Sequence, residues 1–127
     1  MSRTVYDTRF FIEHYYSKDE RTLQRTKEEM RGREKYISAI VIHEVYQLTL
    51  VREGREPAVL RTTLLEKDFK TVKVDAEIAK SSAEFRHKYK LSMAISMIAA
   101  TASHLKATCI SDDSHFQAVK EIKTRWI

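Results

Sequence analysis

The chain has 127 residues, a length that suits one domain with one hydrophobic core. Charged residues make up 32% of it and Asn is absent, a bias typical of thermophilic proteins, while the net charge of +5 is compatible with a polyanionic partner. No apolar run approaches the roughly 18 residues of a membrane helix, the first residues lack a signal-peptide core, and the single Cys109 excludes an intrachain disulfide. We therefore expect a single domain over residues 1–127 that works in the cytoplasm without membrane contact.

The first predicted element is a short buried strand that ends at an acid. Val5 and Tyr6 have the β-branched and aromatic side chains typical of strands, and the apolar residues that begin at Phe10 predict a helix. Thr8 is the expected helix cap. Asp7 lies at the junction, and ligands of open parallel sheets bind in the crevice beyond the carboxyl ends of the strands. Asp7 is therefore a candidate functional residue, the alternative being that it only caps the helix.

Helices and short strands alternate along the rest of the chain. Helices are expected where apolar residues recur at helical spacing after a capping residue, such as Ser38, Asp75 or Ser92. The predicted elements after the first helix are a helix over 21–31, a strand over 36–38, a helix over 39–52, a helix from residue 56, a strand over 69–74, helices over 76–90 and 93–105, a strand over 107–110, a helix from residue 114 and an edge strand over 123–127. This alternation predicts an α/β fold with a parallel sheet and right-handed crossovers.

The helix over residues 39–52 carries a second acid of interest. Val41, Val45 and Leu48 form one apolar stripe because they are spaced by four and three residues. Glu44 lies on the same stripe, where a carboxylate is costly to bury unless a cation meets it. Glu44 is therefore a candidate metal ligand, the alternative being a salt bridge to a Lys or Arg.

A third acidic position follows the late strand. Asp112 and Asp113 come directly after a strand of the central type, as Asp7 does after the first strand. Because the carboxyl ends of parallel strands meet at one edge of the sheet, these acids and Glu44 are expected in one crevice. Hard cations such as Mg²⁺ or Mn²⁺ are held by a few carboxylates plus water, and such a cluster supports phosphodiester hydrolysis.

Basic residues gather at the end of the helix over residues 76–90. Arg86, Lys88 and Lys90 lie among aromatic residues there and are the best local candidates for contacts to an RNA backbone. The alternative is an ordinary solvated helix end. No glycine-rich phosphate loop and no histidine spacing of a zinc finger accompany them.

Four stretches that together span nearly the whole chain resemble the PIN domain, and within it the small VapC-type toxins of toxin–antitoxin pairs. They are Val5–Thr8 with its apolar sequel, Ile40–Val45, Leu91–Ala102 and Ile110–Phe116. The resemblance implies a three-layer α/β/α fold with a central, mostly parallel sheet of about five strands. PIN domains are metal-dependent nucleases, so it also implies an endoribonuclease that uses Mg²⁺ or Mn²⁺. A homodimer and a cognate antitoxin that covers the site are implied as well.

The same resemblance implies roles for individual residues. Asp7, Glu44 and Asp113 match the family's catalytic acids and would hold the metal ion. Asp112 would assist as a further ligand, and Ser111 matches a hydroxyl position that orients water.

Two positions depart from the family pattern. The family usually has an Asp where Ile95 stands, and isoleucine cannot bind a metal ion, so a single and weaker metal site is implied. Arg9 stands where the family often has a small polar residue, and it places a cation near the crevice that either grips phosphate or competes with the metal ion. The alternative function is therefore a PIN-fold protein that binds RNA or a protein partner without cleaving.

Overall fold

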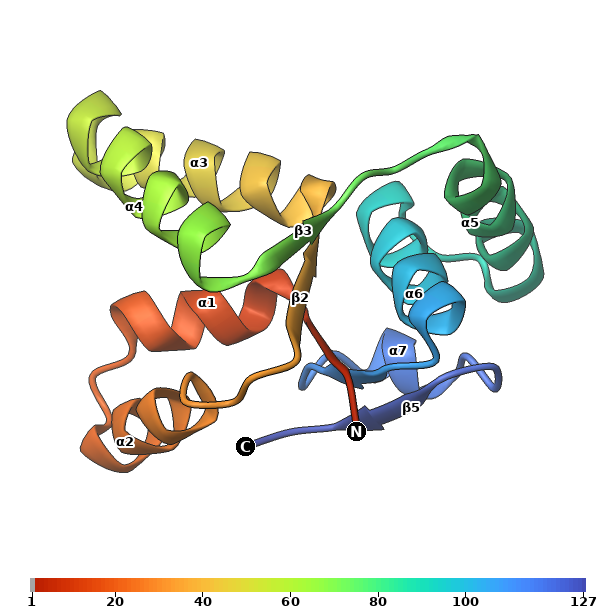
Figure 1. Ribbon diagram of the computed structural model, residues 1–127, viewed down its shortest axis with the longest axis horizontal. Coiled ribbons are helices and arrows are strands. Elements are labelled where there is room, and N and C mark those ends of the chain that lie inside the picture. The colour runs from red at the N-terminus through yellow and green to blue at the C-terminus, as the bar shows by residue number, and fades with distance from the viewer. Residues whose placement is uncertain (1) are drawn as a thin grey trace.

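Short strands alternate with helices from one end of the chain to the other. The structure is a computed structural model, and it describes residues 2–127. In chain order the elements are β1 (Thr4–Tyr6), α1 (Thr8–Tyr16), α2 (Glu20–Glu29), β2 (Lys35–Ser38), α3 (Ala39–Glu53), α4 (Arg55–Asp68), β3 (Lys70–Val72), α5 (Ala76–Tyr89), α6 (Met93–Leu105), β4 (Thr108–Ile110), α7 (Ser114–Gln117) and β5 (Lys123–Arg125) (Figure 1).

All of these strands pair in parallel and form one sheet in the order β3-β2-β1-β4-β5. The central strand is β1, in which Val5 pairs with Tyr36 of β2 on one side and with Cys109 of β4 on the other. In Figure 1, α1 and α2 lie on one side of β1 and β2, and α5 and α6 lie on the other. The predicted three-layer α/β/α fold is confirmed, as are edge positions for β3 and β5.

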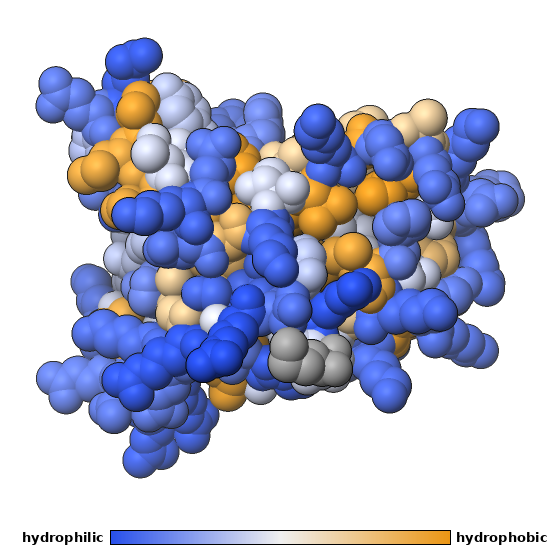
Figure 2. Space-filling model, in the orientation of Figure 1, coloured by the Kyte–Doolittle hydropathy of each residue, from blue (hydrophilic) through white to orange (hydrophobic). Residues whose placement is uncertain are grey.

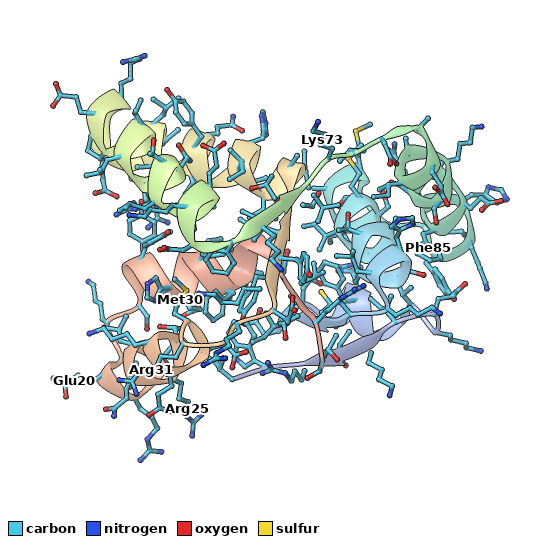
Figure 3. The ribbon with its side chains drawn as sticks, viewed as in Figure 1. Glu20, Arg25, Met30, Arg31, Lys73 and Phe85 are labelled. Atoms are coloured by element: carbon cyan, nitrogen blue, oxygen red, sulfur yellow. The ribbon has the colours of Figure 1, made fainter. Side chains whose placement is uncertain are left out.

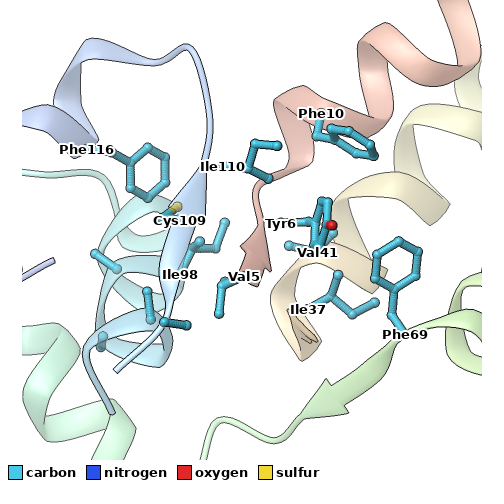
Figure 4. Packing of buried hydrophobic residues seen from close by; sticks show 14 of the residues in the cluster. Val5, Tyr6, Phe10, Ile37, Val41, Phe69, Ile98, Cys109, Ile110 and Phe116 are labelled. Atoms are coloured by element: carbon cyan, nitrogen blue, oxygen red, sulfur yellow. The ribbon is translucent and has the colours of Figure 1, made fainter. Parts of the chain in front are cut away.

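The core forms around β1 because its side chains are apolar on both faces of the sheet. Val5 is fully buried, and Tyr6 packs edge-on against Phe10 and Phe69 with ring centroids 4.9 and 5.1 Å apart (Figure 4). Cys109 is a buried free thiol in β4, and burial raises its pKa, which agrees with a structural role. This rigid centre fixes the carboxyl end of β1, where Asp7 follows.

Three of the predicted helix caps are confirmed and one is wrong. Ser38, Asp75 and Ser92 each accept a hydrogen bond from a backbone N–H in the first turn of α3, α5 and α6. Thr8 is instead the first residue of α1, and Asp7 occupies the N-cap position without a side-chain capping hydrogen bond. Asp7 therefore stands at the cap position, but its carboxylate accepts its hydrogen bond from Ser111 and does not only cap the helix.

The face of the molecule seen in Figure 2 is largely hydrophilic, and the apolar side chains on it gather in patches. The side chains of Glu20, Arg25 and Arg31 extend away from the ribbon around α2, and Arg25 is exposed (Figure 3). Several large apolar side chains are exposed on the paired helices α3 and α4, namely Leu50, Val51, Val59, Leu60 and Leu64. Within residues 2–127, no helix has the length and apolar character needed to span a membrane.

Candidate active site

A cleft of about 230 Å³ opens beyond the carboxyl ends of β1 and β4. Its walls come from the start of α1, from α3, from the first turns of α6 and from the loop after β4. The lining residues are Asp7, Thr8, Arg9, Ile12, Glu44, Ser92, Ala94, Ile95, Ile98 and Asp113. The topology thus brings the three predicted acids of the first strand, the third helix and the late loop to one cleft.

Asp7 is the most buried acid of the cleft, with 4% of its surface exposed. Its backbone N–H donates to the carbonyl of Ile110, which ties the end of β1 to the end of β4. Its Oδ2 accepts a hydrogen bond of 2.6 Å from the Ser111 hydroxyl. A carboxylate held in this way has a fixed orientation and little contact with water.

Burial raises the pKa of Asp7 from its ordinary value of 3.8 to about 6. The Ser111 hydroxyl and the nearby backbone amides of Thr8 and Arg9 oppose this rise, and the negative charge of Glu44 adds to it. None of the salt bridges formed within residues 2–127 includes Asp7. A cation in the cleft would therefore stabilise the ionised form of Asp7.

Glu44 is half-buried, and Thr8 orients its carboxylate. The sequence predicted no role for Thr8 in the site. The Thr8 hydroxyl donates a hydrogen bond of 2.5 Å to Glu44 Oε1, across 36 positions of sequence. None of the salt bridges of the described residues includes Glu44, so the salt bridge considered as its alternative role is not formed. Thr8 therefore holds this carboxylate at the cleft instead of capping α1.

Asp113 is joined to Asp7 through Ser111, whose Oγ accepts from the Asp113 backbone N–H at 3.0 Å. The Oδ1 atom of Asp113 accepts from the backbone N–H of His115 at 2.9 Å and lies 2.7 Å from its Nδ1. Partial burial acts to raise the pKa of Asp113, but the contacts with His115 and the charge of Arg9 outweigh it and lower the pKa. Asp113 is therefore ionised under conditions where Asp7 still holds its proton.

Asp112 is engaged by Arg9 and is not among the residues that line the cleft. The guanidinium Nε and Nη2 donate to Asp112 Oδ1 and Oδ2 at 3.0 and 3.2 Å, a two-point contact, and Nη2 also donates to Glu13 at 3.3 Å. The hydrogen bond and charge of Asp112 raise the pKa of Arg9. Asp112 thus differs from Asp113, its neighbour, in both surroundings and partner.

The donor set of the cleft consists of carboxylate and hydroxyl oxygens, which suit hard divalent cations such as Mg²⁺ or Mn²⁺. Among residues 2–127, no group of three or more His, Cys, Asp or Glu is gathered closely enough to count as a metal cage. Asp7, Glu44 and Asp113 line one cleft but stand apart, so the residues fit a divalent ion by their chemistry and not by a preformed cage.

The basic residues predicted to contact RNA lie outside the cleft. Arg86, Lys88 and Lys90 are exposed around the end of α5, and Lys88 pairs with Glu121 at 3.2 Å. Their contact with an RNA backbone stays a prediction.

A parallel sheet with an acidic cleft at its carboxyl edge places this chain among the α/β proteins whose ligand sites lie beyond the carboxyl ends of the strands. The comparisons with known proteins make the class more specific. The family profile of the PIN domain matches residues 4–122, so the chain belongs to the PIN domain family. A search of curated protein sequences gave no match.

Solved structures share the fold at low sequence identity. A DNA-bound VapBC from Salmonella typhimurium has a TM-score of 0.80 and 16% identity, over 99% of this chain and 98% of that one. A toxin–antitoxin complex from Klebsiella pneumoniae has a TM-score of 0.76 and 23% identity, over 98% and 99% of the two chains. VapC20 of Mycobacterium tuberculosis, a sarcin–ricin loop cleaving toxin, has a TM-score of 0.75 and 17% identity, over 94% and 98%.

Proposed function

We propose that this chain is a divalent-metal-dependent endoribonuclease and the toxin of a VapBC-type toxin–antitoxin pair. The observation that carries the proposal is the meeting of Asp7, Glu44 and Asp113 at one cleft of a PIN domain, with Asp7 buried and without a salt bridge in the described chain. Nucleases of this family generally use divalent metal ions, and the oxygen donors of this cleft favour Mg²⁺ or Mn²⁺.

In this proposal Asp7, Glu44 and Asp113 hold the ion, which when bound activates water and stabilises charge on the scissile phosphate. Ser111 orients Asp7 through its 2.6 Å hydrogen bond, and Thr8 orients Glu44. The apolar side of the cleft, which includes Ile12, Ile95 and Ile98, excludes water and so strengthens the electrostatic interactions of the carboxylates.

The partners proposed for the chain follow from those of its structural neighbours. The similar structures include VapBC complexes and a toxin–antitoxin complex, and one is a toxin that cleaves the sarcin–ricin loop. We accordingly propose an RNA substrate and an antitoxin partner for this chain. From its resemblance to VapC-type toxins we further propose that the antitoxin covers the cleft and that the chain is a single-domain homodimer of the cytoplasm.

One observation favours a second candidate function, a PIN-fold protein that binds RNA or a partner without cleaving it. Ile95 lies on the cleft wall beside Asp7 and Glu44, where the family usually has an Asp. The isoleucine side chain has no oxygen atom, so the cleft lacks the metal-binding carboxylate that an Asp would provide at this position. The two functions differ in whether a cleft with three acids cleaves RNA.

Binding of Mn²⁺ is expected to weaken by about tenfold for each pH unit below 6, because Asp7 must lose its proton to bind the ion and its pKa is about 6. The measurement is the rise in Tm caused by Mn²⁺ at pH 5, 6 and 7.5. Since the pKa of Asp113 is lowered, that residue is ionised throughout this range and does not produce the effect. A Tm rise that stays constant from pH 7.5 to 5 would contradict the role given to Asp7.

Induction of the chain in a bacterial host is expected to arrest growth, and expression of the Asp7→Asn variant at the same level is expected to leave growth unchanged. The physical reason is that the variant keeps the fold but loses an acid of the cleft. Co-expression of a cognate antitoxin, sought as a small protein encoded beside the gene, should restore growth with the wild-type chain. Equal arrest by both chains would count against nuclease activity as the cause of toxicity.

A further inference from the structure

The cleft holds three carboxylates but must admit an anion if it cleaves RNA. Of its lining residues, Arg9 alone has a basic side chain. Arg9 lies two residues after Asp7 on the first turn of α1, and 42% of its side chain is exposed. It is therefore the one fixed positive charge in the cleft wall that an entering phosphate can reach.

The Arg9 guanidinium is held along one edge only. Its Nε and Nη2 bind Asp112 through two hydrogen bonds, and Nη2 also reaches Glu13. Within the part of the chain that the structure describes, no hydrogen bond uses Nη1. The N–H groups of Nη1 are thus left for a ligand, while the edge bound to Asp112 fixes the plane of the group.

Stability alone does not account for this arrangement. Exposed ion pairs contribute little to the free energy of unfolding, and both side chains here are exposed by a third or more, 42% for Arg9 and 34% for Asp112. What the two-point contact does supply is orientation, since the planar guanidinium fork matches the geometry of a phosphate as well as that of a carboxylate.

We propose that Arg9 binds an RNA phosphate at the cleft through its guanidinium, and that Asp112 is a positioning residue for Arg9 and not a metal ligand. This proposal rests on the proposed function and specifies how its site takes up the substrate. Arg9 supplies positive charge on the wall of the cleft. Because Ile95 stands where the family usually has an Asp, the cleft has one fewer carboxylate than is usual in the family to repel the phosphate. The predicted metal role of Asp112 is replaced in this account by its contact with Arg9.

The test is the affinity for a labelled single-stranded RNA, measured by fluorescence anisotropy in EDTA over a series of salt concentrations. EDTA prevents metal-dependent cleavage, so binding is read separately from activity. Arg9→Ala is expected to weaken binding about tenfold and to reduce the slope of log K against log salt by about 0.7, the value for one phosphate contact on a single strand. Arg9→Lys should keep the slope and recover part of the affinity, because it keeps the charge but not the fork.

The matched control is Arg25→Ala, which removes the same charge from an exposed position on α2. It is expected to leave both affinity and slope within twofold of the wild type. Affinity and slope that are the same for Arg9→Ala and Arg25→Ala would overturn the proposal, as would a wild-type chain that does not bind the RNA. A chain that binds RNA through Arg9 but never cleaves it would refute the proposed function alone.

The positioning role of Asp112 has its own readouts. Asp112→Asn should weaken RNA binding in the wild-type background, because Arg9 is then no longer held in place. In the Arg9→Ala background it should leave RNA affinity unchanged, because its effect acts through Arg9. It should also leave the Mn²⁺-induced rise in Tm intact, whereas Asp7→Asn removes that rise. Equal effects of Asp112→Asn in both backgrounds would show that Asp112 does not act through Arg9. Loss of the Mn²⁺ response would return Asp112 to the metal site.

Discussion

The Asp7→Asn variant is expected to lose RNA cleavage by at least about 100-fold and, at the same time, to unfold at a higher temperature than the wild-type chain in EDTA at pH 8. Changes in the partners of a metal ligand already cost 10- to 100-fold, so removal of a ligand should cost more. Asn keeps the size of the side chain and can still accept the Ser111 hydrogen bond. What it removes is a buried negative charge.

The sign of the stability change follows from the pKa of Asp7. Its ordinary value is 3.8, and in the folded chain it is raised to about 6 by burial. Between these values the unfolded chain has lost the proton that the folded chain still holds, so stability falls as pH rises through this window and stays lower above it. A pKa difference of one unit corresponds to about 1.4 kcal/mol. Ionised Asp7 therefore lowers the free energy of unfolding by roughly 1–3 kcal/mol at pH 8, and an Asn at this position does not.

Thermal unfolding in EDTA at pH 8 and at pH 4 measures this effect. The gain in Tm for Asp7→Asn should be several degrees at pH 8 and nearly absent at pH 4, where Asp7 is protonated in the folded chain. Asp113→Asn is the control, because the pKa of Asp113 is lowered and its charge stabilises the fold. A fall in Tm for Asp7→Asn as large as that for Asp113→Asn would show that Asp7 is a structural acid.

The Ile95→Asp variant is expected to bind Mn²⁺ at least tenfold more tightly than the wild type and to be less stable without metal. Ile95 lines the cleft and packs against the core, so its loss should lower the free energy of unfolding by about 1–3 kcal/mol. In return, the new carboxylate adds an oxygen donor beside Asp7 and Glu44, and ion affinity rises with ligand charge. Its position three residues after Ser92 also suits a negative charge at the start of α6.

Ile95→Asn provides the matched comparison, since it makes the same change in shape and polarity without the charge. The measurement is the Mn²⁺ dependence of Tm for both variants. Both should be destabilised in EDTA, but only Ile95→Asp should show a larger response to Mn²⁺ than the wild type. An equal response of the two variants would mean that position 95 does not face the ion.

The elements that local sequence determines could be predicted well. The strand before Asp7 and the caps at Ser38, Asp75 and Ser92 depend on side chains within a few residues of the element they start. The strand predicted over residues 69–74 is shorter in the structure, Lys70–Val72, because Phe69 ends α4 and packs into the aromatic core. The periodic pattern could not distinguish a core aromatic at a helix end from a strand residue.

The partners within the site could not be predicted, because they join distant parts of the chain. Thr8 meets Glu44 across 36 positions, and Arg9 meets Asp112 across 103. The topology of a parallel sheet predicted Glu44, Arg9 and Asp112 near one crevice, but Thr8 was predicted only as a helix cap, and neither pairing was predicted. Which acid is buried and which is paired depends on the packing of α1 against the loop after β4.

Whether this chain is a nuclease is decided by cleavage of a structured RNA by the purified wild-type chain with Mn²⁺ or Mg²⁺, run beside Asp7→Asn and Ile95→Asp. We expect that the wild type cuts the RNA, that EDTA stops cleavage, and that Asp7→Asn is inactive, so that three acids suffice. Cleavage by Ile95→Asp alone would contradict the proposed nuclease function. The natural chain would then be a catalytically inactive PIN domain that binds RNA or a protein partner.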